Sequence, residues 1–173
     1  MTNAYHEAKH FIKKHVNAGK EDVFIPTGTG MTGAVLKFQR ILGLKVPEKA
    51  AQYLEFPDEE RPVVFITHME HHSNQTSWLE TLAKVELIRA TPDGLVDLEH
   101  LDVLIEKHKG RKQLIASVTG CSNVTGIETP YREIAKKMHR VGGLCFVDFA
   151  CSGPYVEIDM HPKNDPDASL DAI

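Results

Sequence analysis

The sequence has few cysteines, no long apolar run and no concentration of positive charge. Among its 173 residues, cysteine occurs at three positions, Cys121, Cys145 and Cys151. An odd count without Cys-x-x-Cys spacing argues against a disulfide framework and a structural zinc site, so we expect reduced thiols. No stretch approaches the ~20 apolar residues that a membrane span requires, and residues 1–20 lack the apolar segment of a signal peptide. The sequence therefore predicts a cytoplasmic protein without a membrane partner.

The charged residues are mixed along the chain rather than sorted by sign. Lys and Arg number 20 against 24 Asp and Glu, and the formal net charge is −4. Because a nucleic-acid-binding surface requires a basic patch or stripe, we expect no nucleic-acid partner. The length and the 42% hydrophobic content suit one core, and we expect a single domain over residues 1–173.

Short apolar runs alternate with segments of helical periodicity. The segments that predict strands are 22–26, 62–67, 84–91, 113–119 and 144–148, with the start of another at 171–173. The segments that predict helices are 4–18, 31–41, 73–82, 98–108 and 129–138, with a short helix possible at 48–54 in a loop. The first helix is amphipathic and should cover another element. This alternation predicts an α/β fold with three layers, a mostly parallel sheet carrying helices on both faces.

Polar clusters follow four of the predicted strands. They occupy residues 28–30, 70–72, 122–126 and 148–152. Ligands of parallel sheets bind at the carboxyl ends of the strands. We therefore expect these four clusters to converge on one site.

A glycine-rich turn follows the predicted strand at 22–26 and opens a helix. Gly28 to Gly33 fits the pattern Gly-x-Gly-x-x-Gly, which is typical of dinucleotide binding. That fingerprint also requires a strand ending in an acidic residue about 20 positions later, where this chain has Pro47-Glu48-Lys49 without a clear strand. A nicotinamide-dependent oxidoreductase stays as an alternative.

More generally, backbone amides at a helix start and nearby threonine hydroxyls suit a phosphate, although a turn without a ligand fits as well. The hydroxyls belong to Thr27, Thr29 and Thr32.

Three histidines surround Glu70. The spacing of His68, His71 and His72 matches neither His-Glu-x-x-His nor its reverse, so we predict no metal site. An imidazole at a strand end can instead stack on an aromatic ring and assist proton transfer. A cluster of surface histidines is the alternative.

Asp148 ends an apolar run in which Cys145 is expected to be a core residue. A carboxylate in low-dielectric surroundings requires a cation or several donors. A protonated ring nitrogen would satisfy it, as in pyridoxal-phosphate enzymes, where an acid keeps the pyridine nitrogen protonated. An aspartate that merely caps a turn is the other interpretation.

Taken in chain order, these elements resemble the class V aminotransferase family of fold-type I enzymes, which includes cysteine desulfurases. The matching stretches are Phe24 to Gly30, Met69 to Asn74, Ser122 to Gly126 with Glu128 to Ala135 behind it, and Phe146 to Ser152. The resemblance implies a truncated large domain of a pyridoxal-phosphate transferase. It also implies an amino-acid substrate, with desulfuration of cysteine first and transamination or another lyase reaction second, and a homodimer.

The resemblance assigns a role to each candidate residue. Gly28, Thr29 and Gly30 would hold the phosphate of pyridoxal 5'-phosphate, and His71 would stack on its ring. Asn123 would hydrogen-bond near the ring's 3-oxygen. Asp148 would pair with the pyridinium. His71 and Asp148 are thus the catalytic candidates.

Several departures from the family pattern accompany these matches. Cys151 stands where the family has a glutamine that contacts the phenolic oxygen, and a thiol is a weak donor. Gly30 stands where a second Thr or Ser is common. The expected amino-terminal arm, Schiff-base lysine and small carboxyl-terminal domain are not found, so we expect residues 1–173 alone to be inactive and to bind the cofactor weakly or not at all. A non-catalytic interaction domain with the same fold remains the other alternative.

Overall fold

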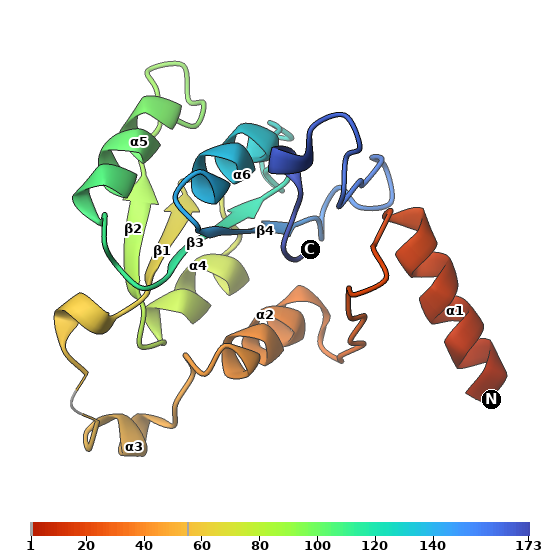
Figure 1. Ribbon diagram of the computed structural model, residues 1–173, viewed down its shortest axis with the longest axis horizontal. Helices are drawn as coiled ribbons and strands as arrows, with labels where there is room; N and C mark the ends of the chain where they lie inside the picture. Colours follow the sequence, from red (N-terminus) through yellow and green to blue (C-terminus); the bar gives the residue numbers. More distant parts are fainter. Residues whose placement is uncertain (1, 55) are drawn as a thin grey trace.

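The core of the chain is a parallel sheet of four strands, seen in a computed structural model that describes residues 2–54 and 56–173 (Figure 1). In chain order the strands are β1 (Val63–Thr67), β2 (Lys84–Ile88), β3 (Leu114–Thr119) and β4 (Leu144–Asp148). Their order across the sheet is β2-β1-β3-β4, and every pair is parallel. The predicted parallel α/β sheet is confirmed.

The two central strands are buried along their whole length. Every residue of β1 and every residue of β3 is shielded from solvent. This is the reason for their continuous apolar sequences, because helices cover a parallel sheet on both faces and leave no solvated side. The edge strand β2 is only partly buried.

Helices pack on both faces of the sheet, as the three-layer prediction required. In Figure 1, α5 (Leu98–Lys107) and α6 (Tyr131–His139) lie above the strands, and α2 (Gly30–Ile41) and α4 (His72–Leu79) lie below. The upper layer buries Leu101 and Ile134 against β1 and β3. The lower layer packs Trp78 and Phe38 against the opposite face of the sheet. The β-strand periodicity therefore divides the core into two apolar clusters.

The first helix does not cover the sheet. Helix α1 (Thr2–His15) has no buried residue, and Phe11 is 70% exposed. In Figure 1 this helix stands apart from the strands, on the right of the molecule. The prediction of a covering helix is wrong, because amphipathic periodicity identifies an apolar face but not the surface that it meets.

The segment 22–26 is not a strand, contrary to the prediction. Its residues have no strand partner in the described part of the chain, and Val23 and Ile25 are exposed. The segment is held at its start instead: Lys13 Nζ donates to the Asp22 carbonyl over 2.6 Å, and His161 Nε2 lies 2.6 Å from Asp22 Oδ2. The glycine-rich turn therefore follows an irregular segment, which removes the strand that a dinucleotide fingerprint requires.

Several element ends differ from their predicted positions. Helix α4 ends at Leu79 rather than Leu82, and β2 ends at Ile88 rather than Thr91. The short helix α3 covers Glu48–Ala51, and two 3-10 helices, η1 and η2, cover Asp58–Glu60 and Pro166–Ala168. At the far end, Ala172 forms a parallel bridge with Phe146 of β4, in agreement with the predicted start of another strand.

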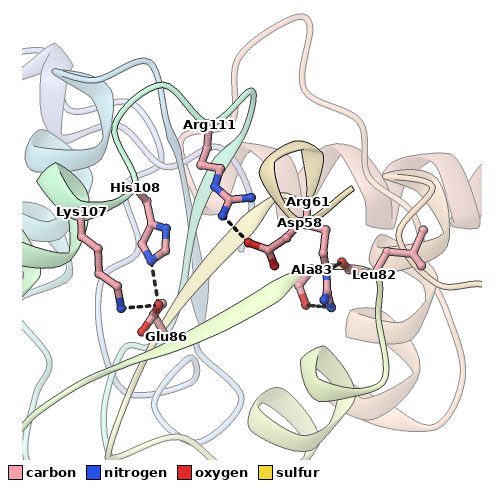
Figure 2. Close-up of polar contacts among 8 residues, drawn as sticks. All are labelled: Asp58, Arg61, Leu82, Ala83, Glu86, Lys107, His108 and Arg111. Atoms are coloured by element: carbon pink, nitrogen blue, oxygen red, sulfur yellow. Dashed lines mark hydrogen bonds and ion pairs between the residues drawn. The ribbon is translucent and has the colours of Figure 1, made fainter. Parts of the chain in front are cut away.

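Polar contacts fix the edge strand β2 to its neighbours (Figure 2). The Arg61 side chain donates to the Leu82 and Ala83 carbonyls just before the strand, over 2.8 and 3.3 Å. Further along, Glu86 Oε1 lies 2.7 Å from His108 Nε2 and 2.8 Å from Lys107 Nζ at the end of α5. These bonds position β2 without a second neighbouring strand.

None of the helices in residues 2–54 and 56–173 is both long and apolar enough to cross a membrane.

Candidate cofactor site

The glycine-rich turn presents open backbone amides at the start of α2. Thr29 precedes the helix with φ 64° and ψ 29°, and Gly30 follows with φ 62°. A left-handed threonine is strained, and such residues concentrate at ligand sites. A side chain at Gly33 would collide with the Gly28 carbonyl, so the turn folds tightly onto the first helical turn. Because no side chain caps these amides, the turn suits an anion.

Asp148 is a buried carboxylate with little compensation. It is 6% exposed at the end of β4, and its Oδ1 accepts one hydrogen bond, from the Ala150 N–H over 2.8 Å. Burial raises the pKa of Asp148, while the Ala150 hydrogen bond and the field of His71 lower it by less. Within the described residues, no lysine or arginine lowers the pKa of Asp148. The buried carboxylate therefore has no lysine or arginine partner in this part of the chain, and a bound cation would stabilise its charge.

His71 lies near Asp148 and caps α4. Its Nδ1 accepts the Ser73 N–H over 3.2 Å and lies 2.8 Å from Ser73 Oγ. The imidazole, rather than a serine or asparagine side chain, caps this helix, and Asn74 is buried in the first turn. The capping contacts fix an exposed ring at the strand end. The effect of His71 on the Asp148 pKa shows that the two groups share a neighbourhood.

One cavity joins the glycine-rich turn to Asp148. It has a volume of about 430 Å³, and Thr27, Met31, Ser117 and Asp148 all line it. Most of the remaining wall is apolar, from the end of α1, from α2 and from β4. A mainly apolar hollow with a few polar groups is typical of a small-molecule site. The residues on either side of the predicted cluster 28–30 therefore share this cavity with Asp148, whereas Gly28, Thr29, Gly30 and His71 do not line it, so the expected convergence of all four clusters on one cavity is not seen.

Asn123 lines a different, smaller cavity. That hollow of about 290 Å³ is bounded by residues that follow β1 and β3, among them His68, Glu70, Ser122 and Asn123. Three of the four predicted clusters follow β1, β3 and β4, whereas residues 28–30 follow an irregular segment. Over residues 2–54 and 56–173, no three His, Cys, Asp or Glu side chains gather as metal ligands.

Comparison with known proteins assigns the family. Residues 1–164 match the family described as aminotransferase class V. The chain belongs to the class V aminotransferase family. A probable cysteine desulfurase of Halalkalibacterium halodurans is 31% identical over 92% of this chain and 36% of its own length. A cysteine desulfurase of Haloferax volcanii is 37% identical over 56% of this chain and 23% of its own length.

Solved structures of cysteine desulfurases share the fold of this class V chain. The enzyme CsdA of Escherichia coli superposes with a TM-score of 0.66 at 22% identity, over 92% of this chain and 37% of its own. A cysteine desulfurase of Thermococcus onnurineus gives the same score. The chain thus spans about a third of the length of the relatives it matches. The fold is that of part of a fold-type I large domain, as predicted.

A buried polar network supports the site of this class V chain, and sequence analysis missed it. Asn74 Nδ2 donates to Glu70 Oε2 over 2.7 Å, while Asn74 Oδ1 accepts from Trp78 Nε1 over 3.0 Å and from Ser117 Oγ over 2.8 Å. Burial raises the pKa of Glu70 to about 6, although hydrogen bonds from Thr67 and Asn74 counteract it. The local signal was the Asn74-x-x-x-Trp78 spacing, which places those two side chains on one face of α4, whereas Glu70 precedes the helix.

The cysteine that departs from the class V pattern lies beside a second cysteine. Cys151 is exposed, and its Sγ donates to the Cys121 carbonyl over 3.4 Å. Cys145 is fully buried in the core, as predicted, and burial raises the pKa of its thiol to about 12. The structure therefore separates a core thiol from two thiols at the strand ends.

Proposed function

We propose that residues 1–173 form the pyridoxal-phosphate-binding part of an enzyme that acts on an amino acid, with cysteine desulfuration as the first candidate reaction. One observation carries the proposal: the buried Asp148 carboxylate lines the same cavity as Thr27 and Met31, the residues on either side of Gly28–Gly30. A protonated pyridine nitrogen supplies the missing cation, and a phosphate suits the open amides of α2. The residues present therefore fit this cofactor.

Each candidate residue has a defined task in this arrangement. Gly28, Thr29 and Gly30 would hold the phosphate through their backbone and through the Thr29 hydroxyl. His71 would lie against the ring face, with its orientation set by the contacts to Ser73. Asp148 would keep the ring nitrogen protonated. By the family resemblance, Asn123 and Cys151 would approach the phenolic oxygen side of the ring, although Asn123 lines the smaller cavity and not the one that Asp148 lines.

The bound cofactor would supply an electron sink for charge that develops on the substrate's α-carbon. The chain's own residues determine how well that sink works. Asp148 would favour the protonated form of the ring nitrogen, because its buried carboxylate would gain from a cationic neighbour. The apolar wall around Phe38 and Phe146 would limit the access of water to a bound ring.

The reaction of the whole protein follows from its relatives only as a proposal. The matched relatives are described as cysteine desulfurases, so cysteine is the first substrate to test, and transamination or another lyase reaction comes second. We also propose a homodimer in the cytoplasm, with residues 1–173 as one part of its large domain. The nicotinamide alternative loses its basis, because no strand precedes Gly28 in the described part of the chain.

A titration of the chain with pyridoxal phosphate tests the proposal. We expect saturable binding, seen as a change in cofactor absorbance, with weaker binding of pyridoxal because it lacks the phosphate. Reduced nicotinamide dinucleotide should not compete. Binding of the dinucleotide, or no binding of pyridoxal phosphate at any concentration, would overturn the assignment in favour of an oxidoreductase or an interaction domain.

A further inference from the structure

Two thiols meet where strands β3 and β4 end. The strands run parallel with Thr119 opposite Asp148, so the residues that follow them emerge side by side. Cys121 comes two residues after Thr119, and Cys151 comes three residues after Asp148. The fold, rather than local sequence, brings these cysteines together, because they are 30 residues apart.

The Cys151 side chain lies against the backbone of Cys121. Cys151 Sγ is 3.4 Å from the Cys121 carbonyl oxygen. Since a carbonyl oxygen is about 2.4 Å from its own Cα, Cys151 Sγ lies within about 6 Å of the Cys121 Cα. A disulfide joins Cα atoms about 4.4 to 6.8 Å apart, so closure requires rotation of both side chains and an adjustment of the two segments that follow β3 and β4.

Local hydrogen bonds fix the Cys121 backbone in this position. Thr119 Oγ1 donates to the Cys121 carbonyl over 2.7 Å, and the Gly120 N–H donates to the Asp148 carbonyl over 2.8 Å. A side chain at Gly120 would collide with the Phe149 ring, so the turn after β3 packs directly against the segment after β4. The approach of the two thiols is therefore a property of the packed strand ends.

The three cysteines differ in their access to reagents. Cys151 is exposed and Cys121 is partly exposed, whereas Cys145 is fully buried. A small oxidant can therefore reach the pair and cannot reach the core thiol. Burial and the nearby Cys121 and Asp148 raise the pKa of the Cys151 thiol, which slows its reaction, so its greater access is the reason that Cys151 should react first.

We propose that Cys121 and Cys151 form a reversible dithiol–disulfide site that low-molecular-weight disulfides, such as oxidised glutathione, close. The Cys151 thiolate attacks one sulfur of the small disulfide, and the other half leaves as a thiolate. The Cys121 thiolate then attacks Cys151 Sγ and releases the second half. The small disulfide gains two electrons and the two protons that the cysteines lose, so two free small thiols accompany each protein disulfide.

Closure of this bond would act on the cofactor site, a consequence that rests on the proposed function. Cys151 is three residues from Asp148 and stands where the family resemblance places a contact to the phenolic oxygen. A disulfide removes that thiol and ties the end of β3 to the end of β4. We expect the oxidised chain to bind pyridoxal phosphate more weakly than the reduced chain, and a reducing thiol to restore binding.

Intact mass and thiol counting after exposure to oxidised glutathione test the site without the cofactor. Wild type should lose two of its three thiols, retain no glutathione and keep its tryptophan fluorescence. Cys121→Ser should instead retain one glutathione on Cys151, because the resolving thiol is missing. Cys151→Ser should react more slowly, and Cys145→Ala should behave as wild type. Wild type that retains glutathione, or keeps all three thiols while an unfolded sample reacts, would overturn the proposal.

A second measurement separates this proposal from the proposed function. Pyridoxal phosphate is titrated into the reduced and the disulfide forms of the same chain. Disulfide formation in a chain that binds no cofactor would refute the function and leave the thiol site standing. Equal affinities in the two forms would refute the effect of oxidation on the cofactor site, because both forms would then present the same contacts.

Discussion

The buried carboxyl group of Glu70 should make the stability of this protein pH-dependent, and Glu70→Gln should remove that dependence. Burial raises the pKa of Glu70 from 4.5 to about 6, against the lowering effect of hydrogen bonds from Thr67 and Asn74. Because a pKa difference of one corresponds to about 1.36 kcal/mol, the rise from 4.5 to about 6 corresponds to about 2 kcal/mol of unfolding free energy.

The sign of the pH dependence follows from which state, folded or unfolded, binds the Glu70 proton more tightly. The folded state holds the Glu70 proton more strongly than the unfolded state, so this contribution to stability is complete below pH 4.5 and is lost as the pH rises through about 6. The amide that Glu70→Gln introduces mimics the protonated carboxyl group at every pH. The unfolding free energy of Glu70→Gln, relative to that of wild type, should therefore rise by about 2 kcal/mol between about pH 4 and pH 7.5.

Urea denaturation at these two pH values measures the change. The comparison is a double difference, so any constant cost of losing the Asn74 hydrogen bond cancels. Glu59→Gln, at an exposed position, is the matched control for removal of one carboxyl group. If Glu70→Gln and Glu59→Gln follow wild type in parallel at both pH values, Glu70 is not held in the buried state described above.

Three further substitutions test the packing around the site. Asn74→Ala should lower the unfolding free energy by about 3 kcal/mol, because it leaves buried polar partners unsatisfied; a loss below about 1 kcal/mol by tryptophan-monitored denaturation would contradict the network. Glu86→Gln should lower the unfolding free energy by about 1 kcal/mol at neutral pH and leave it unchanged in acid. Burial would raise the pKa of Glu86, but hydrogen bonds from Lys107 and His108 hold it lower, so its stabilisation is lost as the pH falls; an equal cost in acid would argue against the ion pair. Gly33→Ala should lower the melting temperature and Gly28→Ala should not, because only the former collides with backbone; equal melting temperatures would show that the turn has another shape.

The layers of the fold were predictable because strands that are buried on both faces have continuous apolar sequences. Strands β1 and β3 are apolar along most of their length, and a sheet covered on both faces produces such runs. The irregular segment 22–26 was not predictable, since Val23 and Ile25 alternate as they would in a strand and only the absence of a neighbour among the described residues distinguishes it. Pairing partners are a tertiary property, so local patterns cannot supply them.

The candidate site shows the same division between local and long-range information. Asp148 was identifiable from its place after an apolar run, and the structure confirms its burial. The bond between Asn74 and Ser117 joins residues 43 positions apart, and the approach of Cys151 to Cys121 depends on the register of two strands. The capping role of His71 was missed because side-chain oxygens of Ser and Asn are the usual caps, whereas here an imidazole nitrogen accepts the bond.

The affinity of Asp148→Asn for pyridoxal phosphate tests the central claim most directly. Asparagine keeps the size of the side chain and its bond to the Ala150 N–H but removes the charge that would pair with the ring nitrogen. A hydrogen bond to a charged group contributes about 1.5 to 3 kcal/mol, so affinity should fall by about 10- to 100-fold. The exposed Asp93→Asn is the control and should bind as wild type. A dissociation constant of Asp148→Asn equal to that of wild type would contradict the pairing of Asp148 with the cofactor.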